Sequence, residues 1–192
     1  MHSGWHENRQ KSHEQRYREG TAHGQSTAWW PNGQKASEGE WIAGKKQGLW
    51  TAWCDQGQRL SESEWRDGKQ HGTSTEWHDS GSIDSQSEFR EGKREGPSTE
   101  WYPNGQKSWQ GEYRNDEKHG QWTLWHENGQ KRAVGTYRDG KMHGLWTHWH
   151  ENGQKSAEGT LNNDEKHGQW TYWTENGRIT SQSRYVNGVR QQ

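Results

Sequence analysis

Tryptophan recurs at a fixed spacing in this chain, and its large flat ring is the side chain here best suited to stacking on a ligand. We count positions in each repeat from the glycine that occupies every 24th residue, so that position 5 lies five residues after it. Position 5 is tryptophan in every repeat. After Trp5, these residues are Trp29, Trp53, Trp77, Trp101, Trp125, Trp149 and Trp173. A row of such rings can stack on sugars, on a peptide or on a protein surface, because a large exposed apolar patch usually marks a binding site. We therefore predict these seven tryptophans as binding residues.

The face on which this tryptophan row lies depends on the strand register. In one register the rings share a face with threonine at position 3 and with glutamate at positions 14 and 16. A bulge or a three-residue loop would instead turn the rings toward the packed face, since a one-residue slip moves every side chain to the other side of a sheet. Both arrangements are consistent with the sequence.

Histidine and cysteine do not form a recognisable catalytic or metal-binding pattern. Histidine precedes the reference glycine in five repeats, at His23, His71, His119, His143 and His167. Equivalent residues of neighbouring repeats should lie roughly 9–10 Å apart. A metal site needs several ligand atoms that each lie about 2 Å from one shared ion, which this spacing does not allow. Cys54 is the single cysteine, and no catalytic pattern of residues surrounds it in the sequence. We expect a turn-shaping role for the histidines, no metal, no cofactor and no enzymatic activity.

The elements that position these side chains follow from an unbroken 24-residue period. The chain has 192 residues, which is eight times 24. Of its 25 glycines, 24 fall at positions 0, 9, 15 or 20 of the repeat. A fixed period of this length is typical of repeat proteins whose terminal repeats act as caps. We predict a single repeat array over residues 1–192, with residues 1–24 and 169–192 as capping repeats.

Each repeat reads as a two-stranded antiparallel hairpin, which gives about 16 strands in total. Asn-Gly at positions 8 and 9 predicts a two-residue type I′ turn, in which both residues have positive φ. This turn would pair position 2 with position 15, and position 0 with position 17. Position 2 is Trp or Ser, position 15 is mostly Gly or Ser, and position 17 is mostly aromatic. Rings are thus expected to lie flat over neighbouring glycines on one face of the sheet.

The composition excludes several classes of protein. Leu, Ile, Val and Phe number only 12, against 16 Trp and 6 Tyr, so an aliphatic-core α/β domain or helical bundle is excluded. There is no apolar run of membrane-spanning length and no secretory signal, and we therefore expect a cytoplasmic protein. The formal net charge of −1 argues against nucleic-acid binding, which needs a basic surface.

The repeat resembles the MORN repeat, and most closely its bacterial variant. The resemblance rests on the pattern E-G-x-[WY]-x-x-G-K-x-H-G followed by W-T-x-W and N-G-Q, and good copies are residues 38–53 and 136–149. It implies an all-β fold: an elongated, curved single-layer antiparallel sheet of about eight stacked β-hairpin repeats. It also implies binding or scaffolding roles with protein or membrane-lipid partners. Some bacterial members are antitoxin- or immunity-type proteins.

Three functions from different classes agree with these observations. The first is a noncatalytic macromolecule-binding or scaffold protein, with an antitoxin- or immunity-type protein–protein binder as its bacterial form. The second is a self-assembling structural protein, in which edge strands pair head to tail into a homo-oligomer or filament. The third is a carbohydrate-binding module with an aromatic ladder. Anionic lipid is a further possible partner, because lysines follow the turns at Lys45, Lys69, Lys93 and Lys141, although acidic residues share those loops.

Overall fold

The computed structural model describes residues 1–192 and contains seventeen β-strands and no helix. It therefore contains no helix that could cross a membrane. The strands are β1 (His2–Trp5), β2 (Lys11–Arg18), β3 (Thr21–Trp29), β4 (Lys35–Ile42), β5 (Lys45–Trp53), β6 (Arg59–Arg66), β7 (Lys69–Trp77), β8 (Ile83–Arg90), β9 (Lys93–Trp101), β10 (Lys107–Arg114), β11 (Glu117–Trp125), β12 (Lys131–Arg138), β13 (Lys141–Trp149), β14 (Lys155–Asn162), β15 (Glu165–Trp173), β16 (Ile179–Val186) and β17 (Val189–Arg190).

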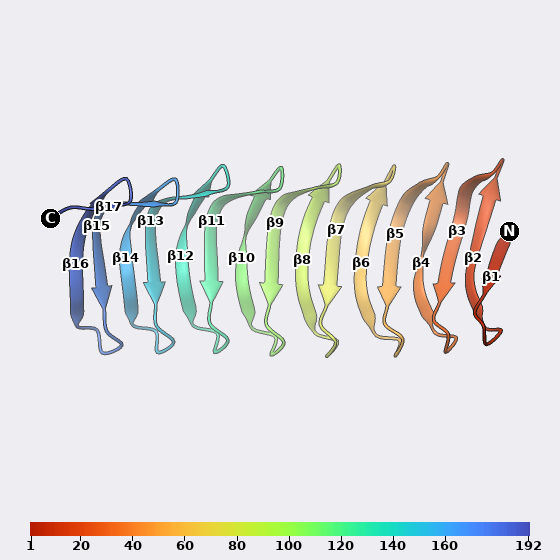
Figure 1. The fold of residues 1–192 in the computed structure, drawn as a ribbon, viewed down its shortest axis with the longest axis horizontal. Helices are drawn as coiled ribbons and strands as arrows, with labels where there is room; N and C mark the ends of the chain where they lie inside the picture. Colours follow the sequence, from red (N-terminus) through yellow and green to blue (C-terminus); the bar gives the residue numbers. More distant parts are fainter. The chain divides into compact units, whose positions relative to one another are not determined.

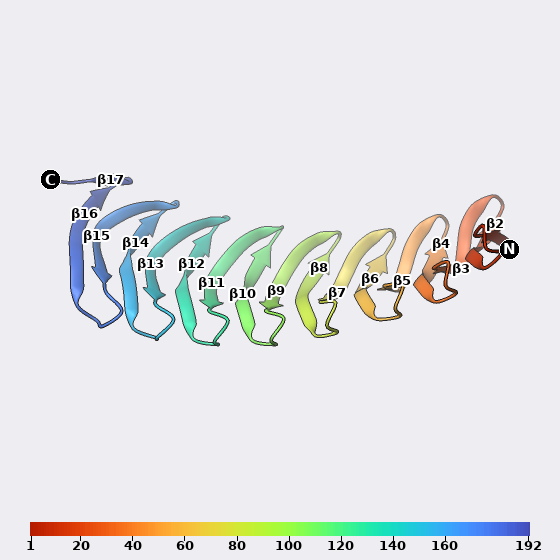
Figure 2. The ribbon, with the colours of Figure 1, turned by 60° about the horizontal axis from the view of Figure 1, so that its bottom comes forward.

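The chain divides into two compact units, residues 1–94 and residues 95–192. Within each unit every strand pairs antiparallel with the next strand along the chain, and the hairpins follow one another in chain order (Figure 1). The strands of both units are visibly bent (Figure 2). The predicted fold class, all-β with antiparallel hairpin repeats, is confirmed. The strand count exceeds the predicted 16 by one because the two-residue strand β17 pairs with β16 after the eighth hairpin.

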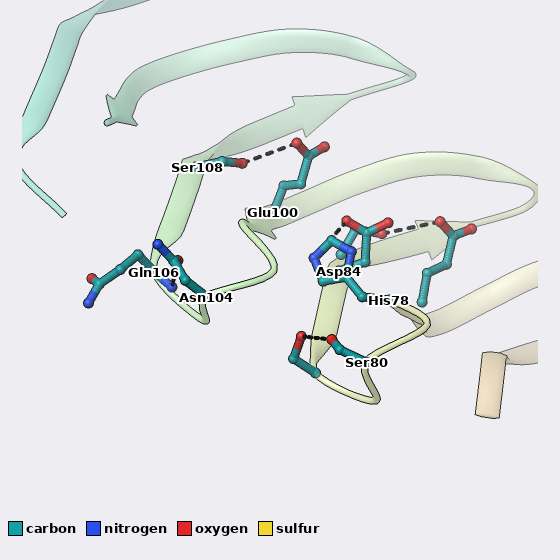
Figure 3. Close-up of polar contacts among 10 residues, drawn as sticks. His78, Ser80, Asp84, Glu100, Asn104, Gln106 and Ser108 are labelled. Carbon is teal, nitrogen blue, oxygen red and sulfur yellow. Dashed lines mark hydrogen bonds and ion pairs between the residues drawn. The ribbon is translucent and has the colours of Figure 1, made fainter. Parts of the chain in front are cut away.

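The Asn-Gly connection is a five-residue loop, so the prediction of a type I′ turn there is wrong. In the loop between β9 and β10, the Tyr102 amide donates to the Gln106 carbonyl at 2.8 Å, and the Gly105 amide donates back to the Tyr102 carbonyl at 2.8 Å. Only Gly105 has positive φ, at 82°. Asn104, which lies beside Gln106 in this loop (Figure 3), instead uses its side chain. Its Oδ1 accepts from the Gln106 amide at 2.9 Å, and its Nδ2 donates to the Glu127 carbonyl at 2.8 Å. The asparagine thus ties its own loop to the loop of the next repeat.

The connection between repeats is the two-residue turn with positive φ at both residues. Asp139 and Gly140 have φ values of 50° and 75°, and they are flanked by the paired residues Arg138 and Lys141. These dihedral angles are those of the type I′ turn that joins two strands tightly. The type I′ geometry therefore lies at positions 19 and 20 of the repeat and not at positions 8 and 9.

The predicted pairing within the hairpin is confirmed. Trp146 lies opposite Gly159, and Gly144 opposite Leu161, which are the position pairs 2 with 15 and 0 with 17. The glycine at position 0 is required because Gly144 has φ of 75° beside a register shift between β12 and β13.

The packed face of residues 95–192 is built from tryptophans that lie on glycines. The three tryptophans at position 2 are only 1–3% exposed, and each ring contacts the glycine at position 15 of the preceding repeat. The pairs are Trp122 on Gly111, Trp146 on Gly135 and Trp170 on Gly159. Tyrosine at position 17 packs edge-on, as the rings of Tyr137 and Trp146 do at 5.4 Å and 86°. The prediction that rings lie over glycines is confirmed in this unit.

The same face of residues 1–94 has one such pair, Trp50 on Gly39. In the next repeat both members are serine. The hydroxyls of Ser63 and Ser74 lie 2.9 Å apart, and both residues are 9% exposed. A hydrogen-bonded serine pair therefore takes the place of a ring and a glycine.

Candidate binding surfaces

The position-5 tryptophans lie on the face opposite the packed one. Along β13, His148 stacks near Trp146 on the packed face, whereas Thr147 donates to Glu158 at 2.9 Å on the other side. Trp149 follows in the same alternation and shares the face of Thr147. The register shift at this hairpin end adds its extra residue to the partner strand β14, so the tryptophan is not turned inward. The tryptophan row therefore shares a face with the threonine at position 3, as the first of the two predicted registers requires.

A cation from the preceding repeat covers most rings of this row. The cation lies 5.4–5.9 Å from the ring centroid, close enough for a cation–π interaction. The pairs are Lys11 with Trp29, Lys35 with Trp53, Arg59 with Trp77, Lys107 with Trp125 and Lys155 with Trp173. The seven predicted tryptophans are half-buried, while Trp5 is 63% exposed. The row is a partly covered ladder and not a set of bare rings.

A carboxylate completes this arrangement in several repeats. Lys155 Nζ lies 2.6 Å from Glu158 Oε2, and Lys11 Nζ lies 2.7 Å from Glu14 Oε2. The hydrogen bond from Lys155 holds the pKa of the Glu158 carboxyl below its ordinary value, and the hydrogen bond from Thr147 acts in the same direction. Residues 1–94 thus present a repeated tryptophan–cation–carboxylate group on one face, and residues 95–192 have one such group, at Trp173.

A second ladder, at position 6, was not foreseen from the sequence. The side chain at this position hydrogen-bonds to the carbonyl of the position-5 tryptophan in the next repeat, at 2.8–2.9 Å. The bonds join His6 to Trp29, Trp30 to Trp53, Tyr102 to Trp125, His126 to Trp149 and His150 to Trp173. The signal in the sequence was that His, Tyr and Trp, which all carry an N–H or O–H, alternate at one position.

Cys54 departs from this ladder, because it is a free, half-buried thiol without such a hydrogen bond. His78 also faces Asp84 of strand β8, with Nε2 3.4 Å from Oδ1 (Figure 3).

The side chain at position 23 accepts a hydrogen bond from the turn that follows. His23 Nδ1 accepts from the Ala43 amide at 3.4 Å, and Gln47 Oε1 accepts from the Asp67 amide at 3.0 Å. An acceptor is all that this position needs, which explains why glutamine can replace histidine there. No group of three His, Cys, Asp or Glu side chains comes close enough to hold a metal ion.

Two hollows open on the packed face of residues 1–94. The first has a volume of about 170 Å³, and its lining includes Lys46, Trp50, Ser61, Ser63 and Trp65. The second has a volume of about 280 Å³, and its lining includes Gln70, Ser74, Glu76, Ser85, Phe89 and Arg94. Most of these residues occupy equivalent positions 24 residues apart. The serines were visible in the sequence, but the open space above them was not.

Two descriptions of the MORN repeat match the chain. The MORN repeat variant matches residues 70–91, 118–139, 142–163 and 166–187. The MORN repeat itself matches residues 38–49, 86–107 and 134–145. The chain belongs to the MORN-repeat family.

No curated protein matches the chain. Among solved structures, one match is a mutant of S. aureus TarM in complex with Fondaparinux, alpha-GlcNAc-glycerol and UDP. It is 14% identical, the TM-score is 0.33, and the match covers 50% of this chain and 19% of that chain. A likeness of this size carries no argument about function.

Proposed function

We propose that this MORN-repeat protein is a noncatalytic protein-binding or scaffold protein, and that the position-5 tryptophan row contacts the partner. MORN repeats are generally found in binding or scaffold proteins, which supports the broader part of this proposal. An antitoxin- or immunity-type partner is the more specific form that the bacterial variant of the repeat suggests.

The observation that carries the proposal is the repeated tryptophan–cation–carboxylate group. Tryptophan and arginine are enriched at binding hot spots, and a hot spot is typically an aromatic anchor surrounded by polar groups. A cation holds five of the seven rings in place, so little side-chain entropy is lost there on binding. The half-exposed ring edges and the charged groups beside them offer a partner both apolar contact and hydrogen bonds.

This surface also favours binding over catalysis. Its tryptophan recurs in every repeat and its cation in most of them, whereas a reaction centre needs a particular nucleophile, base or metal at one place. Head-to-tail self-assembly, lipid binding and carbohydrate binding by the row remain predictions that the same surface does not favour over a protein partner.

The experiment begins with in vivo crosslinking to identify a protein partner, followed by affinity measurements on purified protein. Trp173→Ala removes the ring of a complete group, which Lys155 and Glu158 form with it. Tyr17→Ala is the control, because Tyr17 is an aromatic residue that is 51% exposed at position 17 on the opposite, packed face. A hot-spot tryptophan costs at least about 2 kcal/mol on truncation, or roughly 30-fold in Kd. We expect that loss for Trp173→Ala and less than a twofold change for the control.

Equal affinities for the two variants would place the partner elsewhere and contradict the proposal. Circular dichroism and the melting temperature of each variant show whether a loss of affinity reflects unfolding. Capture of a toxin-like enzyme would support the antitoxin form.

A further inference from the structure

The two hollows on the packed face of residues 1–94 interrupt a surface that aromatic rings otherwise cover. In the first hollow, the rings of Trp50 and Trp65 form the walls. In the second, Phe89 occupies the place equivalent to Trp65, and Ser74 the place equivalent to Trp50. The hollows follow each other by one repeat, which corresponds to roughly 9–10 Å across two strands.

The floor of the first hollow does not suit another flat ring. Where Trp50 lies on Gly39, a Cβ atom added to that glycine would overlap the indole ring. Ser63 stands at the equivalent place in the next repeat, and it carries such a Cβ atom together with a hydroxyl bonded to Ser74 at 2.9 Å. A ligand in this hollow must therefore fit over the Cβ atom and the hydroxyl of Ser63.

The polar residues that line the hollow favour a ligand with many hydrogen-bond donors and acceptors. Lys46 Nζ lies 4.4 Å from the centroid of Trp50 and 4.5 Å from that of Trp65, and it has no protein acceptor within hydrogen-bond distance. An ammonium group has three donors and no acceptor. Its half-buried position lowers the pKa of Lys46 through loss of hydration, as expected for a cation without an acceptor.

The second hollow adds charged and amide groups to the same kind of floor. Glu76 accepts a hydrogen bond from Ser85 at 3.4 Å, so most of its acceptor capacity remains for a ligand. Gln70 supplies an amide, which can both donate and accept, and its Nε2 already lies 3.5 Å from the Ser63 hydroxyl. Arg94 supplies a guanidinium on the same lining. The carboxylate disfavours a purely anionic ligand, and the two cations disfavour a purely cationic one.

We propose that these hollows bind a carbohydrate chain, with the apolar C–H face of one sugar on the parts of the Trp50 and Trp65 rings that Lys46 leaves uncovered, and with the hydroxyls of the chain on Lys46, Gln70 and Glu76. A sugar combines a flat apolar face with hydroxyls that both donate and accept, which is the combination that this lining presents. An aromatic side chain from a protein partner would contact the rings but would leave the Lys46 ammonium without an acceptor. The site lies on the face opposite the tryptophan row and does not depend on the proposed protein binding.

The first test is a titration followed by NMR of the indole N–H signals of the full-length protein. The probes are cellohexaose, chitohexaose and a galacturonic acid hexamer, each added to about millimolar concentration. We expect at least one probe to shift the signals of Trp50 and Trp65 while those of Trp149 and Trp173 stay in place. The proposal is overturned if no probe shifts Trp50 or Trp65, or if the shifts are confined to the tryptophan row. N-acetyl-tryptophanamide is added separately, and a shift of Trp50 and Trp65 with it alone would assign the hollow to a protein side chain.

A filling variant tests the hollow itself. Ser63→Gly combined with Ser74→Trp rebuilds the ring-on-glycine pair found at Trp146 and Gly135, and should fold because that pair already exists in the chain. We expect it to weaken the responding oligosaccharide at least tenfold. Lys46→Met, which keeps the stem and removes the ammonium, serves if the filling variant does not fold. Trp149→Ala is the control and should bind the sugar normally. Unchanged sugar affinity in a folded filling variant overturns the proposal without affecting the protein-binding proposal.

Discussion

Residues 1–94 and residues 95–192 are built from the same 24-residue repeat, yet their packed faces are filled in different ways. In residues 95–192, three tryptophans lie on three glycines, and Ala133, Trp146, Leu161 and Trp170 form a buried cluster. In residues 1–94, a single such pair is followed by serines and two hollows. The backbone hairpin is therefore compatible with both an aromatic and a polar filling.

The difference shows that the residues at positions 2 and 15 depend on each other across strands. A buried tryptophan needs a glycine beneath it, because a Cβ atom there would overlap the ring. Where the ring is absent, as at Ser74, the glycine is no longer required and Ser63 takes its place. Burial of one large ring stabilises the fold by about 4–6 kcal/mol at about 25 cal/mol per Å², so residues 95–192 should be the more stable unit.

The largest expected effect comes from removing a buried ring. Trp146→Ala should lower the free energy of unfolding of residues 95–192 by about 3–5 kcal/mol, because the ring is 2% exposed and its loss leaves a cavity. Ser74→Ala at the equivalent position of the other unit should cost less than about 1.5 kcal/mol, the worth of one hydrogen bond. Urea denaturation with hydrogen exchange measured in each unit gives both values. Similar losses for the two variants would mean that the two faces do not differ in packing.

A smaller loss is expected when the glycine beneath a ring gains a methyl group. Gly135→Ala should cost about 1–3 kcal/mol, because the new Cβ atom would overlap the ring of Trp146. Ser63→Gly should leave stability within about 1 kcal/mol, the usual cost of glycine in a strand interior. The double variant Gly135→Ala with Trp146→Ser should lose less free energy of unfolding than the sum of the losses of the two single variants. Additive losses in this double-mutant cycle would contradict the coupling of positions 2 and 15.

A gain of up to about 1 kcal/mol is expected at a turn of residues 1–94. Ala43 has φ of 49°, a left-handed conformation that asparagine adopts more readily than alanine. The equivalent turn residue in residues 95–192 is Asn115 or Asp139, which already suits that conformation. Ala43→Asn should raise the melting temperature, and Asp139→Asn should leave it nearly unchanged. No difference between the two variants would show that this turn is unstrained.

The smallest effect is a pH dependence confined to residues 95–192. Burial lowers the pKa of His148, and the charges of Arg132 and Lys166 act in the same direction. The folded state therefore resists protonation more than the unfolded state. Its stability is complete above the unfolded pKa of about 6.5 and falls as the pH drops toward the lower folded pKa.

His148→Leu should remove this acid sensitivity, since Leu124 already occupies the equivalent position in another repeat. The measurement is the urea midpoint at pH 7.5 and pH 5.5 for the original protein and the variant. If the variant loses as much stability at pH 5.5 as the original protein, His148 is not the group responsible.

Much of the fold could be predicted from the sequence because each repeat has strand-forming and turn-forming residues at the same positions. The pairing of Trp146 with Gly159 was predicted from a two-residue Asn-Gly turn, and the five-residue loop gives the same pairing because the register shift beside Trp149 adds one residue to β14. The turn type at Asn104 could not be predicted, because this asparagine bonds to the Glu127 carbonyl 23 residues away. A local Asn-Gly signal does not contain that partner.

The candidate sites were predictable only in part. Alternation along the strand placed Trp149 on the outer face, but the cation over Trp173 comes from the preceding repeat through a register shift that the sequence does not show. Ser63 and Ser74 were visible as departures from the repeat. Their hydrogen bond and the hollow beside them depend on the absence of a ring, which becomes clear only when neighbouring strands are packed together.

The most direct test of this account is the hydrogen-exchange rate of each indole N–H, measured in one set of NMR spectra of the intact protein. The account predicts the slowest exchange for Trp122, Trp146 and Trp170, intermediate exchange for the position-5 row, and fast exchange for Trp5. Fast exchange at Trp122, Trp146 and Trp170 together with slow exchange in the row would reverse the two faces and contradict the account.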